Sequence, residues 1–348
     1  MDRSAVWLKP AFATGWAAAC CSLVVVSLFG AEPAQLHPYR VIECGADNSR
    51  PAVVTGVSIT PDGRTVAAAT DDHCVLTIDV AQGAITARLE GHADWVRCVG
   101  LSADGKTLAS GAGDRSICVW DVTEQKQIFQ TAASGKAIAA LCFHPNNEQI
   151  AVVGFSNRLQ IINTSAGQTT QQLGCPCVEI RSVAFSPDGE RLAVAGRNGR
   201  IRVWNVDAGS QERDIETGGR RIRALAFSPD SRLLAAAGDG AVIHVFDAAT
   251  GQTSIQLNTS PAKVHALVFV GDRELASGGT DNRIVIWDLE SGQAVRHLLG
   301  HTGTVAALAC DASGNILVSG SYDTTLRIWD LGQGALPSIA HSPNETVR

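Results

Sequence analysis

Short apolar segments separated by turn residues follow one another along most of the chain. The clearest unit spans residues 300–330, where VAALAC (305–310), ILVSG (316–320) and TLRIWD (325–330) each predict a β-strand, because they are rich in β-branched and small apolar residues. The segments DASGN and SYD between them favour turns. The unit opens with Gly-His and closes with Trp-Asp. Three strands of this length cannot bury both of their faces alone, so the unit needs neighbours of its own kind.

The closing Asp position recurs at a nearly constant interval. Successive occurrences are 42, 42, 42, 42, 41 and 42 residues apart, at Asp79, Asp121, Asn163, Asn205, Asp247, Asp288 and Asp330. A period of about 40–45 residues, with four strands per unit, is the signature of a β-propeller blade. The sequence therefore predicts an all-β fold, a seven-bladed β-propeller of four-stranded antiparallel blades over residues 39–336. The polar residues 337–348 are expected to form a flexible tail.

The repeated motif resembles the WD-repeat, G-beta-like propeller family over about residues 39–335. Units two and seven carry the motif from Gly-His to Trp-Asp, whereas unit six keeps Ser277, Asp281 and the Trp-Asp pair but lacks the Gly-His. The resemblance implies that an N-terminal strand completes the last blade and closes the ring. We expect Tyr39–Cys44 to do so, beside the strand that ends at Trp329, because this pairing removes an exposed sheet edge.

The resemblance also implies a buried chain of hydrogen bonds in units two and seven, from an indole through a hydroxyl and an imidazole to a carboxylate. The residues concerned are His92, Ser110, Asp114 and Trp120 in unit two, and His301, Ser319, Asp323 and Trp329 in unit seven. Ser, His and Asp are also the residues of a nucleophilic triad. Here the serine lies in the middle of a strand rather than on a strained turn, and the set occurs twice, so we interpret both sets as structural.

The first 31 residues differ in composition from the propeller. Arg3 and Lys9 precede residues 11–31, which carry no charge. A basic start and an apolar core are typical of a secretory signal peptide, but this stretch is also long enough to span a bilayer. The sequence therefore predicts an apolar N-terminal helix over residues 1–31, either a cleaved signal peptide or a membrane anchor, followed by a linker at residues 32–38. Both alternatives predict a periplasmic or secreted propeller, with membrane contact limited to residues 11–31.

Charge and cysteine content narrow the classes of function. The net charge of −6 lacks the basic excess of nucleic-acid-binding proteins, so no nucleic-acid partner is expected. Eight of the ten cysteines lie outside the leader, and most stand within predicted strands, which favours small buried core residues. Cys175 and Cys177 lie in a connection, but no second Cys or His pair with zinc spacing accompanies them. We expect neither a metal nor a cofactor.

Candidate binding residues follow from the resemblance, which implies that partners dock on the face carrying the connections between second and third strands. Aromatic and Arg residues at that face are typical interface anchors. The candidates are Trp95, Phe155, Arg197 and Tyr322. A basic run, which is either a patch for an acidic partner or a solvated rim, comprises Arg181, Arg197, Arg200, Arg220, Arg221 and Arg223.

Two functions remain open on the sequence. The first is a non-enzymatic, monomeric scaffold, exported or membrane-tethered, that binds another protein through one propeller face. The alternative is a propeller that binds a small ligand or acts catalytically at its central channel, which would require several His, Asp or Glu side chains on channel-facing first strands. We interpret these strands as apolar throughout (VSIT, VRCVGL, ALCF, SVAF, ALAF, ALVF and ALAC), and this favours the scaffold.

Overall fold

The computed structural model describes residues 34–36, 40–45, 51–132, 135–156, 158–175, 179–259 and 262–332, the first of these by its backbone alone. The leader expected at residues 1–31, Tyr39 and the tail expected at residues 337–348 lie outside the described residues. Every regular element in the described ranges is a β-strand. Within them, no helix is long and apolar enough to cross a membrane.

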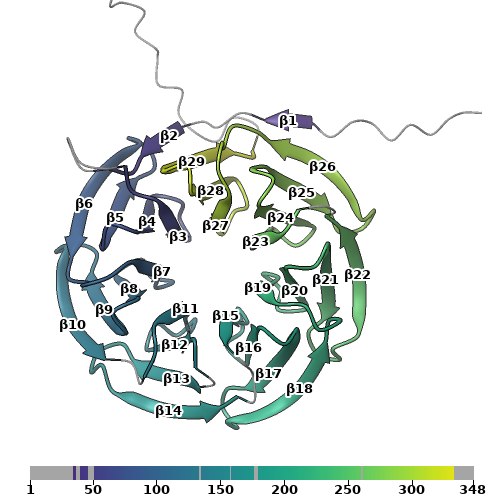
Figure 1. Cartoon of the computed structure of the whole chain (residues 1–348), viewed down its shortest axis with the longest axis horizontal. Helices are drawn as coiled ribbons and strands as arrows, with labels where there is room; N and C mark the ends of the chain where they lie inside the picture. The colour runs from purple at the N-terminus through teal and green to yellow at the C-terminus, as the bar shows by residue number, and fades with distance from the viewer. Residues whose placement is uncertain are drawn as a thin grey trace, which may run out of the picture. The chain divides into compact units, whose positions relative to one another are not determined.

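The described strands form seven sheets that follow one another around a ring (Figure 1). The innermost strands are β3 (Val54–Ile59), β7 (Val96–Leu101), β11 (Ile138–Phe143), β15 (Ile180–Phe185), β19 (Ile222–Phe227), β23 (Val264–Val270) and β27 (Val305–Cys310). The second strands are β4 (Thr65–Thr70), β8 (Thr107–Ala112), β12 (Gln149–Gly154), β16 (Arg191–Gly196), β20 (Leu233–Gly238), β24 (Glu274–Gly279) and β28 (Ile316–Ser321).

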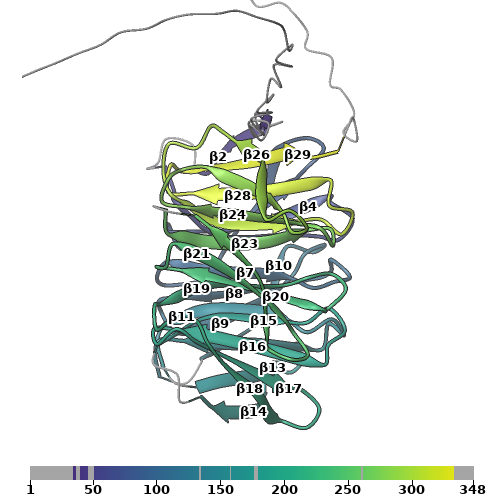
Figure 2. The same ribbon diagram turned by 90° about the vertical axis from the view of Figure 1, so that its right-hand side faces the viewer.

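The two outer layers complete the blades. The third strands are β5 (Cys74–Asp79), β9 (Ser116–Asp121), β13 (Arg158–Asn163), β17 (Arg200–Asn205), β21 (Val242–Asp247), β25 (Ile284–Asp288) and β29 (Thr325–Asp330). The outermost strands are β6 (Ala84–Glu90), β10 (Lys126–Ala132), β14 (Thr169–Gly174), β18 (Ser210–Glu216), β22 (Thr253–Asn258) and β26 (Gln293–Leu298). Seen from the side, the strands run from one face of the ring to the other (Figure 2). The predicted all-β, seven-bladed propeller with four-stranded antiparallel blades is confirmed.

Two short strands from the N-terminal region add to outer edges of the ring. β2 (Arg40–Glu43) pairs antiparallel with β29, so that the sheet of the seventh blade has the order β2-β29-β28-β27. β1 (Ala34–Leu36) lies within the segment expected to be a linker and pairs in parallel with β26. The sixth sheet therefore has five strands rather than the four of its neighbours.

The apolar core lies between the blades rather than inside one central mass. Among the described residues, buried apolar side chains form seven clusters, and each cluster joins two successive blades. The second strands are buried almost throughout, as in β4, where Ala67, Ala68 and Ala69 are fully covered. Small side chains suit this layer because neighbouring sheets approach closely near the axis of the ring.

The expected hydrogen-bond chain is present in blades two and seven. In blade seven, the indole N–H of Trp329 donates to Ser319 Oγ over 2.9 Å, and Ser319 Oγ lies 2.7 Å from His301 Nε2. Nδ1 of His301 lies 2.8 Å from the Asp323 carboxylate. Blade two repeats the arrangement, with Trp120 and His92 at 2.9 and 2.8 Å from the Ser110 hydroxyl. The acceptor Asp323 fixes the neutral tautomer of His301 that carries its proton on Nδ1.

The chain of hydrogen bonds shifts the pKa values of its ionisable members. Burial lowers the pKa of His301, and contact with Asp323 only partly opposes this effect. Burial raises the pKa of Asp323, but hydrogen bonds from the Thr325 hydroxyl, the Thr302 amide and His301 outweigh it and lower that pKa to about 2. The carboxylate therefore stays charged, and it ties the loop before β27 to the turn between β28 and β29.

Replacing the serine of this chain tests its contribution to stability. In the Ser319→Ala variant, both His301 Nε2 and the Trp329 N–H lose their hydrogen-bond partner. In Ser277→Ala, a matched change in blade six, only the Trp287 N–H loses its partner. We expect Ser319→Ala to lower the free energy of unfolding by about 1–3 kcal/mol more than Ser277→Ala, measured by denaturant titration. Equal losses would show that the histidine bond contributes nothing.

Candidate binding site at the channel mouth

The second residue of every innermost strand lines the central channel. At this residue the register of the strand pair shifts in all seven blades, for example between Val54 and Gly56 in β3 and between Ile222 and Ala224 in β19. A β-bulge of this kind bends the strand and re-aims one side chain. The first residue of each strand is buried between blades. The seven bulged residues, which we call the channel mouth, are Thr55, Arg97, Ala139, Arg181, Arg223, His265 and Ala306.

The channel mouth carries three arginines and a histidine, so the expectation that channel-facing first strands are apolar throughout is wrong. Arg97, Arg181, Arg223 and His265 come from blades two, four, five and six. In blades four to six the strand was predicted to begin two residues too late, at SVAF, ALAF and ALVF, and this left the bulged residue outside it. A Val or Ile followed directly by Arg or His was the signal available in the sequence.

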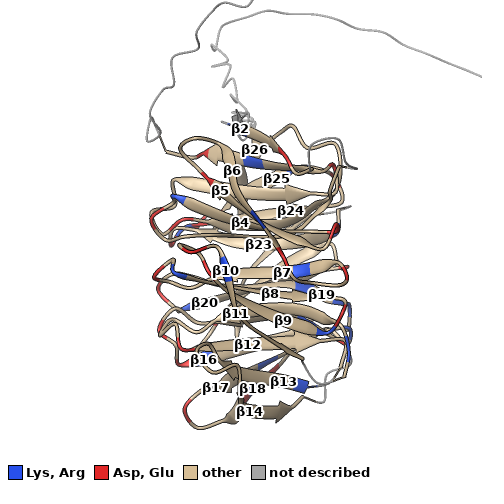
Figure 3. Cartoon of the chain, turned by 90° about the vertical axis from the view of Figure 1, so that its left-hand side faces the viewer, with Lys and Arg blue, Asp and Glu red and all other residues tan. Residues whose placement is uncertain are grey.

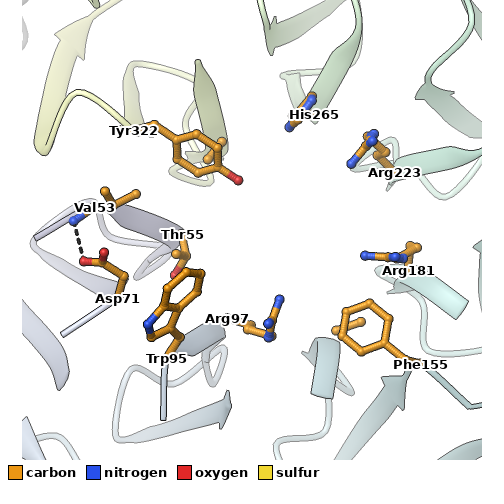
Figure 4. Close-up of a pocket in the computed structure, with 12 residues that line it drawn as sticks. Val53, Thr55, Asp71, Trp95, Arg97, Phe155, Arg181, Arg223, His265 and Tyr322 are labelled. Carbon is orange, nitrogen blue, oxygen red and sulfur yellow. Dashed lines mark hydrogen bonds between the residues drawn. The ribbon is translucent and has the colours of Figure 1, made fainter. Parts of the chain in front are cut away.

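The channel mouth lines a cavity of about 490 Å³ (Figure 4). In blades one, three and seven the bulged residue is small, and there the turn between second and third strands contributes a larger side chain, namely Asp71, Phe155 or Tyr322. Trp95, which precedes β7, and Val53, which precedes β3, also line the cavity. Three of the four candidate residues, Trp95, Phe155 and Tyr322, therefore meet around one cavity. The fourth, Arg197, does not line it.

Two arginines share the ring of Phe155. The guanidinium of Arg181 lies 4.2 Å and that of Arg97 lies 5.3 Å from the ring centre, both within cation–π distance. Among the described residues, Arg97 makes no ion pair, and its Nε is buried without a hydrogen-bond partner. The two guanidinium groups thus approach one aromatic ring from the blades on either side of blade three, and Arg97 does so without a compensating carboxylate.

The other cations of the channel mouth share their carboxylates. Glu179 lies 3.3 Å from Arg181 and 3.4 Å from Arg197. In the same way, Asp239 pairs with Arg223 at 2.7 Å and with Arg221 at 3.9 Å. Burial lowers the pKa of His265, and the positive charge of Arg223 lowers it further. Asp71 also lines the cavity, but Glu179 and Asp239 each serve two arginines, so positive charge remains in excess at this face.

The basic run predicted from the sequence does not form one patch. Arg181 and Arg223 belong to the channel mouth, and Arg197 and Arg221 lie behind them in the pairs with Glu179 and Asp239. Arg200 instead lies on the outer layer, where it pairs with Asp214 at 3.0 Å and with Glu216. In the ribbon coloured by charge, Lys and Arg segments mark the beginnings of β7 and β19 on the same side of the ring (Figure 3).

The described cysteines and acidic residues offer no alternative chemical site. In the described ranges, no group of three His, Cys, Asp or Glu side chains could hold a metal ion. Six described cysteines are free thiols: Cys44, Cys74, Cys98, Cys118, Cys142 and Cys310. Burial raises the pKa of Cys98 and of Cys142 to about 12, so these thiols are unreactive at neutral pH. Cys175 is disulfide-bonded, and Cys177 lies outside the described residues.

Comparison of the sequence with known proteins identifies the family. A family model described as the IFT122 first beta-propeller matches residues 53–281, and the model of the WD domain, G-beta repeat matches residues 292–330. The Periodic tryptophan protein 2 homolog of Schizosaccharomyces pombe is 46% identical over 48 residues, which are 14% of this chain and 6% of that protein.

Two further relatives give the same local likeness. Small ribosomal subunit protein RACK1 of Caenorhabditis elegans is 40% identical over 63 residues, covering 16% of this chain and 19% of that protein. CCR4-associated factor 4 of Saccharomyces cerevisiae is 39% identical over 64 residues, covering 18% of this chain and 10% of that protein. The chain spans less than a fifth of the length of each of these relatives. Because the two family models together extend across most of the ring, the chain belongs to the WD-repeat β-propeller family.

Proposed function

We propose that this protein is a non-enzymatic scaffold that binds another protein through the face of the ring on which the channel mouth opens. The observation that carries the proposal is the exposure of Trp95 and Tyr322, at 50% and 51%, beside a cavity that Phe155 also lines. A partner that covers a large aromatic side chain removes its apolar surface from water, which stabilises the complex. Aromatic residues and Arg are also the usual anchors of interfaces. WD-repeat propellers generally act as protein-interaction scaffolds, which supports the same reading.

The non-enzymatic part of the proposal rests on how the cavity uses its reactive groups. The Thr55 hydroxyl donates to the carbonyl oxygens of Val96 and Ala69. The Asp71 carboxylate accepts a hydrogen bond from the Val53 amide at 2.7 Å. Both groups therefore hold the backbone, whereas a catalytic nucleophile or base needs a free approach to a substrate. The second candidate, a small ligand in the channel, is favoured only by the cavity volume, which falls in the usual range for such sites.

Export or membrane tethering is a further part of the proposal. The uncharged stretch at residues 11–31, after the basic residues Arg3 and Lys9, supports it. We expect the protein in the exported or membrane fraction of its cell, and its presence in the cytosolic fraction alone would contradict this part. The propeller is proposed to act as a monomer.

We also propose that β2 closes the ring. Its pairing with β29 supports this, as does the side chain of Arg40, which donates to the carbonyl oxygen of Gln82 at 3.1 Å and also to that of Ala81 in blade one. Ile42 belongs to the core cluster shared by blades seven and one. The strand thus contributes main-chain bonds to one blade and side-chain contacts to the next.

Matched substitutions in β2 test closure. Ile42 is 7% exposed and Val41 is 51% exposed in the same strand. We expect Ile42→Asp to lower the free energy of unfolding by several kcal/mol, because it buries an unpaired charge, and to abolish hydrogen-exchange protection of those β29 amides that face β2 rather than β28. Val41→Asp should stay within about 0.5 kcal/mol of the parent and keep the protection. Unchanged protection in Ile42→Asp would contradict closure by this strand.

Partner capture tests the docking face. We expect a Trp95→Ala, Tyr322→Ala double variant to lose the proteins that co-purify with the parent chain after cross-linking in its own cell, as quantified by mass spectrometry. The control is Ile128→Ala, because Ile128 is 50% exposed but lies on the outer strand β10. Exposed side chains contribute little to folding, so all variants should be as stable as the parent. If the double variant retains the same partners, or native mass spectrometry shows a bound small molecule instead, this face is not the docking site.

A further inference from the structure

We infer that the channel mouth binds an acidic segment of the partner protein, with one carboxylate held between Arg97 and Arg181 in front of Phe155. The inference rests on the proposed function and names the chemistry of the partner that this face selects. It starts from the charges that the described residues leave uncompensated.

Blade three creates the space for this carboxylate. Its bulged residue is Ala139, a methyl group, whereas the bulged residues of the blades on either side are Arg97 and Arg181. Phe155, from the same blade as Ala139, stands at the cavity wall and contacts both guanidinium groups. The two arginines therefore come from the blades on either side of Ala139, and both approach one aromatic ring. A guanidinium group presents several N–H donors in a planar fork, which matches a carboxylate.

The electrostatics of the cavity favour an anion. Two positive charges placed near one ring repel each other, and an anion between them removes this repulsion. Arg97 makes no ion pair within the described ranges, and its buried Nε lacks a partner. Opposite it, Arg223 shares Asp239 with Arg221, so this side of the cavity is also short of negative charge. Partial burial strengthens each of these interactions relative to water.

The rest of the cavity indicates a peptide rather than a nucleic acid or a free ion. Trp95 and Tyr322 stand half exposed beside the cations and offer apolar surface to neighbouring side chains of a bound segment. A nucleic acid would need a basic footprint that extends beyond the cavity, but the chain as a whole has a net charge of −6. A segment in which acidic and apolar residues alternate satisfies both parts of the surface.

The experiment measures peptide binding to the full chain by fluorescence anisotropy. Three fluorescein-labelled peptides of one length are compared, in which leucine alternates with Asp, with Gln or with Lys. We expect only the Asp peptide to bind. Because the contacts are ionic, its binding should weaken at least tenfold when the salt concentration rises from 0.05 to 0.5 M, an increase that shortens the Debye length about threefold.

Substitutions then assign the binding to the channel mouth. We expect Arg97→Gln and Arg181→Gln each to weaken binding of the Asp peptide about tenfold or more, the loss typical of a charge-assisted hydrogen bond. The control is Arg64→Gln, which makes the same charge change at the β3–β4 turn on the opposite face, where Arg64 is exposed. Should Arg97→Gln prove unstable by thermal unfolding, Arg181→Lys serves instead, since it keeps the charge, loses the planar fork and should still weaken binding severalfold.

Each other outcome overturns the inference. Equal weakening by Arg64→Gln would show a non-specific charge effect. Tighter binding of a phosphoserine peptide or of a single-stranded oligonucleotide, by tenfold or more, would assign the cavity to phosphate instead. If the Asp peptide does not bind while the Trp95→Ala, Tyr322→Ala variant still loses its partners, the docking face stands and only the acidic chemistry fails. If that variant keeps its partners, the proposed function itself fails.

Discussion

Mutual burial of blade faces is the interaction on which the whole structure depends. A four-stranded sheet of this size has two apolar faces and no interior of its own, so each blade is stable only between two others. The seven core clusters lie at the seven contacts between successive blades. The contact between blades seven and one includes Ile42 and Cys44 from the N-terminal region. In this cluster Ile42 lies nearly 300 residues away in the chain from Ile328 of blade seven.

This constraint also decides where the chain can vary. The first residue of each innermost strand is a Val or Ile held between blades, as Val96 and Ile180 are. The bulge that follows turns the next side chain out of that interface and into the channel, where packing no longer limits its size or charge. The same backbone position therefore accommodates Ala139, Arg97 or His265. A rigid ring thus presents seven independently variable side chains at one opening, without a loop having to position them.

The fold could be predicted because its signals are local and repeated, whereas the site depends on features that leave no such signal. The spacing of the closing Asp positions was sufficient for seven blades, since each repeat carries its own turns. A bulge has no fixed residue type, and the apolar run that starts two residues after Ile180 and Ile222 set the predicted start of each strand, so the Ile-Arg pairs before it were left out. Arg197 was expected at the interface by its place in a turn, but its pairing with Glu179, from another loop, is a tertiary contact. In blade four, Val194 stands where blades two and seven have the serine of the hydrogen-bond chain, and the Trp204 indole nitrogen has no hydrogen-bond partner among the described residues.

The hydrogen-bond chains of blades two and seven fix the backbone next to the two exposed aromatic residues, Trp95 and Tyr322. Asp114 accepts a hydrogen bond from the Ala93 amide, two residues before Trp95, and Tyr322 directly precedes Asp323. A network of buried, fully paired groups holds its turn in one conformation because each alternative leaves a polar group without a partner. The backbone that carries Trp95 and Tyr322 is therefore held in place, which would limit the conformational entropy lost if a partner binds there. Blade three has lost the network, and there two arginines hold Phe155 instead. These arginines come from blades two and four, so contacts from the adjacent blades position Phe155 where blade three lacks the network.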